Sequence, residues 1–434
     1  MSPDKRRELR FPCVAPSEIL IPGPDVRPET WAVIACDQYT SQPDYWERVE
    51  AKVGSNPSAL RLVLPEIYLG KEEEIRRKGI LESMKDVLDR HLLVGPSDEV
   101  VPPGFVLTER TTASGVRVGL VAALDLETYD YRSNRLPVRA TEQTVPERLP
   151  PRIRIRSEAL LELPHVLLLT DDPEDLFLGP LYENLRTRQA PDYDFELMEN
   201  GGHLRGWRIW SDRDLAGIAS ALETLERSSG GLLFAVGDGN HSLAAAKACW
   251  EERKAAGADP ETDGFRYALA EMVNLHADAI RFAPIHRFLR NTDAAGLALS
   301  FRNDLKSEGF LPVPGQAFRF VSNGRVVDSF SAIPDENADE GRGGLLPVQL
   351  LQPFLDGFLS ERSLPASSLD YIHGDEALLS LTMEPGTAGI LLEPMRKEDL
   401  FPGIRAGGCL PRKSFSMGEA DEKRFYFEAR RLTG

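Results

Sequence analysis

Apolar residues occur along the chain in two patterns: short continuous runs, and segments in which they recur every three to four positions. The runs are typical of buried strands, and the recurring pattern is typical of amphipathic helices. Strands are expected over residues 31–36, 116–126, 164–170, 232–236 and 267–275. Helices are expected over residues 71–93, over 212–227, and from the turn after residue 236 to Gly257. This alternation predicts an α/β (mixed α+β) fold built on a mixed sheet.

The length of 434 residues exceeds what one hydrophobic core usually serves. After residue 290 the pattern changes to a helix over 294–307, a hairpin across Asn323-Gly324 and a helix over 347–359. Asn-Gly is a favoured two-residue turn between paired strands. We therefore expect a main α/β domain over residues 1–290, and a smaller α+β domain over residues 291–434 that closes over the site of the first.

Composition narrows the class of protein. The formal net charge of −17 argues against a nucleic-acid-binding protein, because binding phosphate backbones requires clustered lysine and arginine. No apolar run is long enough for a membrane span, and the first residues lack a signal-peptide core. The four cysteines lie far apart, with no pattern of a zinc site or a disulfide framework. A cytoplasmic protein with no membrane partner and a small-molecule or nucleotide ligand is expected; oligomeric state is left open.

One stretch has the composition of a binding site. The strand over 232–236 runs into a glycine-flanked turn and then a helix. Glycine allows positive backbone torsions and close approach of a ligand, and Asn240 or Ser242 can cap the helix. The free amides and the dipole at a helix start favour an anion, typically phosphate. The residues expected to bind it here are Gly237, Gly239, Asn240 and Ser242.

Two residues of this turn are candidate catalytic groups. Asp238 can take a proton from a substrate hydroxyl, hold a magnesium ion beside phosphates, or form the turn. His241 can donate to a phosphate oxygen or act as an acid or base near neutral pH. The alternative is a glycine turn with a helix cap and a histidine satisfied by its neighbours.

Residues 132–156 are rich in arginine, which is unusual in an acidic chain. Arginine presents a planar fork of donors that suits phosphate or carboxylate. Arg139, in the segment 139–144, is the candidate expected to face the site. The alternative is that most of these arginines neutralise carboxylates elsewhere.

Three later motifs give the turn a context. The turn itself reads Asp-Gly-Asn-His-Ser from Asp238; Met-Val-Asn follows at 272–274, Pro-Ile-His-Arg at 284–287 and Leu-Pro-Arg-Lys-Ser at 410–414. Their order and spacing resemble the uncharacterised bacterial and archaeal family known as domain of unknown function 1015. Its members carry D-G-H-H-R-x-x-A, M-V-N, P-T-H-R and P-P-K-S-T. The resemblance implies that His286, Arg287 and Lys413 belong to the site.

Two residues depart from the family pattern, because Asn240 and Ser242 stand where histidine and arginine are usual. Phosphate binding would then depend on backbone amides, Ser242 and an arginine such as Arg287 or Arg139. Lys413 would neutralise charge that develops in phosphoryl transfer; the alternative is an exposed basic loop. The order of elements at the turn also resembles the nucleotide pocket of the ParB and sulfiredoxin group, which includes free-serine kinases. In that order a strand is followed by a glycine, a histidine or arginine, and an alanine-rich helix.

Two function classes follow. The first is an enzyme that binds ADP or ATP, with Mg²⁺, and transfers a phosphoryl group to or from a small hydroxylated metabolite. The second is a nucleotide- or metabolite-responsive binding protein without turnover. The Asp-Gly-x-His core favours the first class, and the missing arginine and the absence of a Walker sequence favour the second. A DNA-partitioning role ranks third, because the chain is acidic and has no convincing helix-turn-helix pattern.

Overall fold

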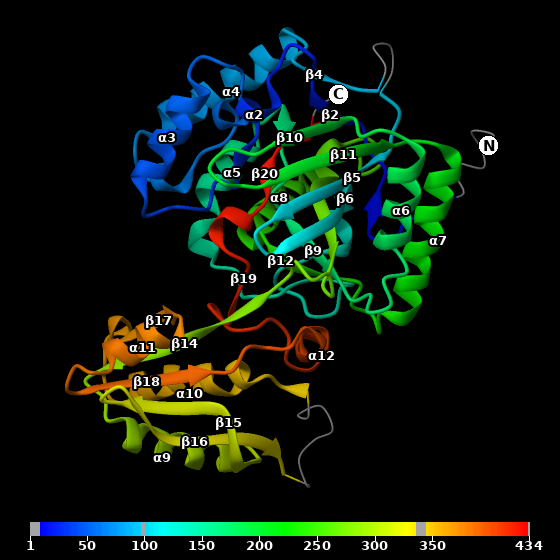
Figure 1. The fold of residues 1–434 in the computed structure, drawn as a ribbon. Helices are drawn as coiled ribbons and strands as arrows, with labels where there is room; N and C mark the ends of the chain where they lie inside the picture. The colour runs from blue at the N-terminus through cyan, green and yellow to red at the C-terminus, as the bar shows by residue number, and fades with distance from the viewer. Residues whose placement is uncertain (1–8, 97–100, 336–343, 433–434) are drawn as a thin grey trace. The chain divides into compact units, whose positions relative to one another are not determined.

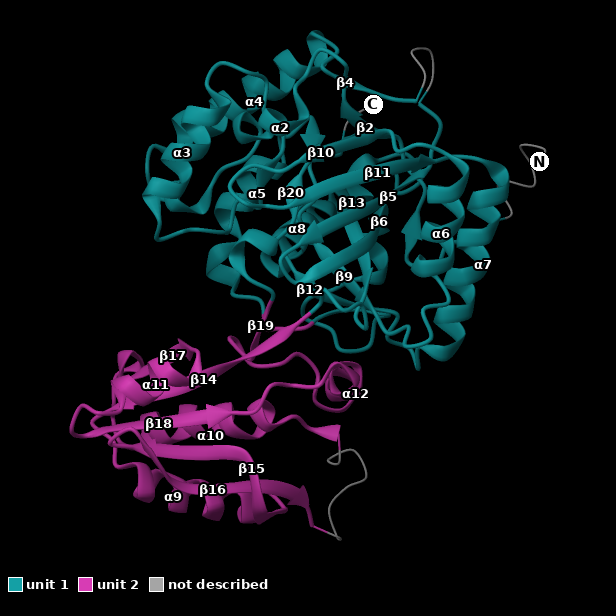
Figure 2. Cartoon of the chain, in the orientation of Figure 1, with its two compact units in different colours: residues 1–140, 144–280, 418–434 teal, residues 141–143, 281–417 magenta. Residues whose placement is uncertain are grey.

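The chain divides into two compact units in a computed structural model that describes residues 9–96, 101–335 and 344–432. Unit 1 comprises residues 1–140, 144–280 and 418–434, and unit 2 comprises residues 141–143 and 281–417 (Figure 2). Among the described residues, none of the helices combines the length and the apolar character needed to cross a bilayer.

These boundaries differ from the expected ones at two places. Unit 2 begins at Arg281 rather than at 291, because β14 (Phe282–Arg290) pairs with strands of that unit. The chain returns to unit 1 after Met417, because β20 (Phe425–Tyr426) pairs with β3 (Val33–Ile34). A strand close to the C-terminus is thus held by a strand close to the N-terminus.

Unit 1 is built on a nine-stranded sheet with the order β10-β11-β5-β6-β13-β9-β12-β7, and β1 pairs with β6. The pairs β12·β7 and β13·β9 are parallel, whereas β12·β9 and β13·β6 are antiparallel, so the expected mixed sheet is confirmed. The strands are β1 (Val14–Ala15), β5 (Phe105–Thr112), β6 (Gly115–Asp125), β7 (Val138–Ala140), β9 (Leu167–Thr170), β10 (Tyr193–Glu196), β11 (His203–Ile209), β12 (Phe234–Asp238) and β13 (Tyr267–Asn274).

Central strands of this sheet are buried along their length, which explains why they read as continuous apolar runs. All four residues of β9 and the first three of β12 are buried. A smaller sheet has the order β4-β2-β21-β8. Its strands are β2 (Ile19–Pro22), β4 (Leu93–Val94), β8 (Leu161–Glu162) and β21 (Ala429–Arg431). The strand expected over 31–36 is reduced to β3, because the preceding residues form a helical turn.

The helices of unit 1 differ in how much of their surface is buried, from none of the residues of α5 to most of the first half of α8. In α7 the apolar residues recur every three to four positions and the buried ones include Leu215, Ile218 and Leu222, while Ser211 caps the helix start. In α8 a small-residue segment is buried, and α5 packs against this helix (Figure 1). The helices are α2 (Pro28–Trp31), α3 (Pro43–Val53), α4 (Glu73–Asp89), α5 (Pro150–Arg156), α6 (Leu178–Arg188), α7 (Asp212–Ser228) and α8 (Asn240–Ala255).

Unit 2 is a smaller α+β unit, as expected. Its sheet has the order β16-β15-β18-β14-β17, with β19 on β14, and its pairs are antiparallel. The predicted hairpin is confirmed: Ser322 pairs with Arg325, and Asn323 and Gly324 both have positive φ, as a two-residue turn of this type needs. The remaining elements are α9 (Ala294–Ser307), β15 (Phe310–Ser322), β16 (Arg325–Pro334), α10 (Pro347–Glu361), β17 (Leu369–His373), α11 (Asp375–Leu381), β18 (Thr387–Leu392), α12 (Lys397–Gly407) and β19 (Phe415–Met417).

Candidate functional site at the start of α8

The turn between β12 and α8 has the backbone geometry expected of an anion site. Gly239 adopts φ of 77° and is the N-cap of α8. A Cβ at this position would come within 3.0 Å of Val166 Cα, so the turn requires glycine there. A cap by Asn240 or Ser242 was expected and is wrong, because both residues lie inside the first helical turn and no side chain of the described residues caps the helix. The N-cap residue therefore offers no side-chain acceptor to the first amides of α8.

Asp238 lies at the end of β12, where the pairing with β9 shifts register. Its Oδ1 accepts a hydrogen bond from the Gly239 amide at 2.9 Å, and its Oδ2 lies 3.2 Å from Lys423 Nζ. Lys423 comes from the C-terminal segment of unit 1, and its side chain is 15% exposed. The structure thus places a cation beside the turn that sequence analysis missed, and nothing in the sequence around Lys423 marks it.

His241 is the second residue of α8. Its Nε2 accepts a hydrogen bond from the Val145 amide at 3.2 Å. A neutral imidazole whose Nε2 accepts carries its proton on Nδ1. Because Nε2 already accepts this hydrogen bond, His241 in this state does not serve as a base through that atom.

Asn240 supplies an unsatisfied polar atom at the same place. Its Oδ1 is buried, and no hydrogen-bond partner for it exists among the residues that the structure describes. A buried acceptor without a partner is destabilising by about 1–3 kcal/mol, so such atoms are uncommon unless a ligand or water satisfies them. The position of this atom, at the first residue of α8, favours a ligand that also carries a donor.

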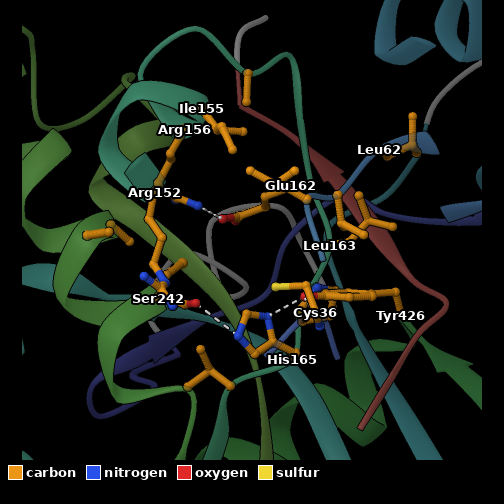
Figure 3. A pocket seen from close by; sticks show the side chains of 18 of the residues that line it. Cys36, Leu62, Arg152, Ile155, Arg156, Glu162, Leu163, His165, Ser242 and Tyr426 are labelled. Atoms are coloured by element: carbon orange, nitrogen blue, oxygen red, sulfur yellow. Dashed lines mark hydrogen bonds and ion pairs between the residues drawn. The ribbon is translucent and has the colours of Figure 1, made fainter. Parts of the chain in front are cut away.

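Ser242 is the end of a chain of hydrogen bonds that reaches into the unit. Its Oγ lies 2.9 Å from His165 Nε2, and His165 Nδ1 lies 2.9 Å from the hydroxyl of Tyr426. The amide of Cys36 donates to that same hydroxyl at 3.2 Å. Figure 3 shows His165 between Ser242 and Tyr426, at the edge of a cavity. Four segments far apart in the sequence meet in this chain.

The groups of this chain are neutral near pH 7. Burial lowers the pKa of His165, and the nearby carboxylates of Asp37 and Asp238 only partly oppose that effect. Burial also raises the pKa of Tyr426 well above its usual value and that of the Cys36 thiol to about 12. Sequence analysis missed His165 and Tyr426. The available signal was weak: His165 stands at the entrance of the apolar run over 164–170.

Arg139 does not reach the turn, contrary to expectation. Its Nε donates to the Leu136 carbonyl at 2.9 Å, and its Nη2 lies 3.3 Å from the Gly231 carbonyl. Gly231 precedes β12, whereas Asp238 ends it, so the guanidinium lies at the end of the strand remote from the turn. Arg139 is 8% exposed and ties the two parallel strands together.

His286 and Arg287 lie in β14, inside unit 2, and neither side chain is exposed. His286 Nδ1 accepts from the Leu392 amide at 3.2 Å, and its Nε2 lies 2.9 Å from Asp375 Oδ1. Arg287 Nε donates to Gln352 at 3.0 Å, and burial lowers the pKa of this arginine to about 10. Both residues therefore have partners within their own unit.

Lys413 also belongs to unit 2, where it has a positive φ of 59°. The next residue, Ser414, donates its amide to Glu142 Oε1 at 3.2 Å, which explains why residues 141–143 group with this unit. A role of His286, Arg287 and Lys413 in an anion site stays a prediction.

The family resemblance is confirmed by a family model. The model described as "Protein of unknown function (DUF1015)" matches residues 20–339. The chain belongs to this family. The match includes the turn and the motif that contains His286, and it ends before Lys413. Lys423, which pairs with Asp238 of the turn, lies beyond the matched residues.

Solved structures that match this DUF1015 protein do so at low sequence identity and low TM-score. A free serine kinase in complex with AMP is 12% identical, with a TM-score of 0.35, and the match covers 72% of this chain and 92% of that one. A mutant of the free serine kinase in complex with ADP is 13% identical, with a TM-score of 0.36 and coverage of 74% and 95%. A conserved hypothetical protein from Pyrococcus furiosus is 12% identical, with a TM-score of 0.32 and coverage of 71% and 94%. No curated protein matches the chain. The bound nucleotides are properties of those kinases.

Proposed function

We propose that the start of α8 binds the phosphates of ADP or ATP, and that the protein transfers a phosphoryl group to or from a small hydroxylated metabolite in the cytoplasm. The observation that supports this most is the uncapped helix start behind Gly239 with Lys423 beside it. Backbone amides, a helix dipole and an ammonium group together favour a phosphate over a neutral ligand.

In this proposal each residue of the turn has one task. The amides of the first helical turn and Lys423 hold phosphate oxygens, and His241 lies in the same helical turn. Asp238 accepts the proton of the attacking hydroxyl as the new O–P bond forms and the bond between the phosphoryl group and ADP breaks. Asp238 can do this only when Lys423 moves toward the phosphates, since it is now paired with that lysine.

Direct contact of magnesium with Asp238 would need the same movement of Lys423 as the proton transfer. In the structure one carboxylate oxygen accepts from the Gly239 amide and the other pairs with the Lys423 ammonium group. A Mg²⁺ ion is commonly held through substrate phosphates and water with few protein ligands. We therefore propose that any magnesium enters with the nucleotide, and we assign no protein ligand to it.

The alternative is a nucleotide- or metabolite-responsive binding protein without turnover. The same pairing of Asp238 supports it, because a carboxylate held by an amide and a lysine is well suited to keep the turn rigid. Transfer of phosphate from labelled ATP to a panel of small hydroxylated compounds separates the two classes. Binding without transfer would favour the alternative.

Binding itself is tested by thermal unfolding with ADP, ATP and inorganic phosphate, with and without Mg²⁺. At least one nucleotide is expected to raise the Tm of the wild type. Lys423→Met is expected to weaken the affinity of the protein for that nucleotide about tenfold, which corresponds to about 1.4 kcal/mol. Lys85→Met removes an exposed lysine on α4 and controls for net charge, so it should leave the affinity unchanged. If no phosphate-bearing compound stabilises the wild type, the proposal is wrong.

A further inference from the structure

A mainly apolar cavity of about 160 Å³ lies in unit 1 next to Ser242. Its apolar lining includes Leu62, Met84, Ile155, Leu163, Leu243 and Ala246. Figure 3 shows Ser242, His165 and Tyr426 gathered at one side of it. An apolar cavity of roughly 150 Å³ is known to accept benzene, so a compact body of about that size fits this space.

The charged residues that line the cavity are paired with one another. Glu162 accepts from Arg156 at 2.6 Å and from Arg430 at 2.7 Å. Arg152 forms an ion pair with Glu66. A ligand would therefore meet no uncompensated charge on these side chains, and a second charged group on it would be buried without a matching partner. Two places can hydrogen-bond a ligand: the wall formed by Ser242, His165 and Tyr426, and the buried Arg156 Nε, which has no hydrogen-bond partner among the described residues.

We infer that the molecule that accepts the phosphoryl group is a small, mainly apolar alcohol, with its body in this cavity and its hydroxyl oxygen at Ser242. The inference rests on the proposed function, because Ser242 belongs both to the cavity wall and to the helix start that is proposed to bind phosphate. It narrows the class of hydroxylated metabolite. Free serine and sugars fit less well, because each extra polar group buried without a partner lowers affinity by roughly tenfold or more.

The hydrogen-bond chain explains how Ser242 would present a donor to the substrate oxygen. The Cys36 amide can only donate, so the Tyr426 oxygen accepts there. In the tautomer that we assign to His165, the phenol donates to Nδ1, and the neutral ring carries its own proton on Nε2 and donates it to Ser242 Oγ. The serine proton is left to point away from His165, toward an acceptor. In this arrangement His165 and Tyr426 are positioning residues, which act through Ser242.

The binding test uses benzyl alcohol and toluene, two probes of similar size that differ in one hydroxyl group. Benzyl alcohol is expected to raise the Tm of the wild type and to shift the methyl NMR signal of Met84. Ser242→Ala should weaken benzyl alcohol about tenfold and leave toluene nearly unchanged, which a purely structural role of Ser242 would not do. Equal effects of Ser242→Ala on both probes would overturn the role of Ser242.

A cavity-filling variant tests the location. Ala246→Leu fills part of the cavity and is expected to abolish binding of benzyl alcohol while Mg·ATP still raises the Tm. Met84 in the wild type gives the second readout, so the inference stays testable even if this variant fails to fold. Absence of the Met84 shift, or benzyl alcohol bound equally by the filled variant, would overturn the inference. Either result leaves the nucleotide proposal intact if Mg·ATP still binds.

The acceptor role itself is tested with labelled Mg·ATP and wild-type protein. Transfer to benzyl alcohol is expected to exceed transfer to free serine by at least tenfold at equal concentration. A preference for free serine would overturn the inference, but it would support the proposed phosphoryl transfer. Loss of transfer to both acceptors, with ATP still bound, would overturn the acceptor role together with the proposed reaction.

Discussion

Two buried histidines, one in each unit, differ in what lies at the end of their hydrogen bonds. In unit 2 the Leu392 amide donates to His286 Nδ1, and the protonated Nε2 donates to the carboxylate of Asp375. In unit 1 the Cys36 amide begins a chain that passes through Tyr426 and His165 to the hydroxyl of Ser242. Both chains begin at a backbone amide, and burial lowers the pKa of both histidines.

The last group of the hydrogen-bond chain distinguishes a structural histidine from one with a role in ligand binding. The carboxylate of Asp375 only accepts, so the chain of His286 is complete within its unit. The hydroxyl of Ser242 can both accept and donate, so the chain of His165 has a proton left for a ligand. Ser242 also borders a cavity and an uncapped helix start. Burial of a histidine alone would have suggested the same role for both.

The largest expected effect comes from removing each imidazole. His165→Ala and His286→Ala should each lower the free energy of unfolding by about 2–4 kcal/mol, because each leaves a cavity and unpaired polar groups. Only His165→Ala should also weaken binding of benzyl alcohol, by about tenfold, because His165 positions Ser242. Denaturant unfolding and titration calorimetry measure the two quantities. A loss of ATP affinity in His286→Ala would instead support the role that the family resemblance assigns to His286.

A smaller effect is expected from breaking the chain in unit 1 while keeping its shape. Tyr426→Phe leaves the Cys36 amide without its acceptor and frees the tautomer of His165, so a loss of about 1–3 kcal/mol in stability is expected. The affinity for benzyl alcohol should fall about threefold to tenfold. Tyr193→Phe is the matched control, because Tyr193 is a buried tyrosine of the same unit whose hydroxyl bonds to Glu428. If both variants change the affinity for benzyl alcohol equally, the hydrogen-bond chain has no special role in binding.

The smallest expected effect is the dependence of stability on pH. Both folded histidines have a pKa below the ordinary 6.5, so between 6.5 and the folded pKa the unfolded chain binds more protons. Their contribution to stability is complete above about pH 6.5 and is lost as pH falls below it, by at most about 1.4 kcal/mol per pH unit for each histidine. Unfolding midpoints from pH 7.5 to 5.5 measure this slope. His165→Gln and His286→Gln should each flatten it; an unchanged slope in both would contradict these pKa shifts.

Part of the site was predictable because its geometry is local. The strand, the glycine turn and the helix over 232–257 follow from apolar spacing and from the torsions that glycine allows, and all three are present. The mixed sheet and the second α+β unit were also predicted. The expectation that Arg139 faces the turn was wrong. An arginine-rich segment shows which residues could bind an anion, but the direction of each side chain depends on how the strand is paired.

The sequence by itself determined the family, the turn and the presence of Asp238, His241 and Ser242 in it, because these depend on neighbours within a few residues. Only the tertiary structure decided that Lys423 pairs with Asp238 and that Tyr426 reaches His165 across 261 positions of the chain. The physical reason is the pairing of β20 with β3, which brings the C-terminal segment into unit 1. Such strand pairing depends on the whole fold, so the spacing of residues along the sequence does not predict it.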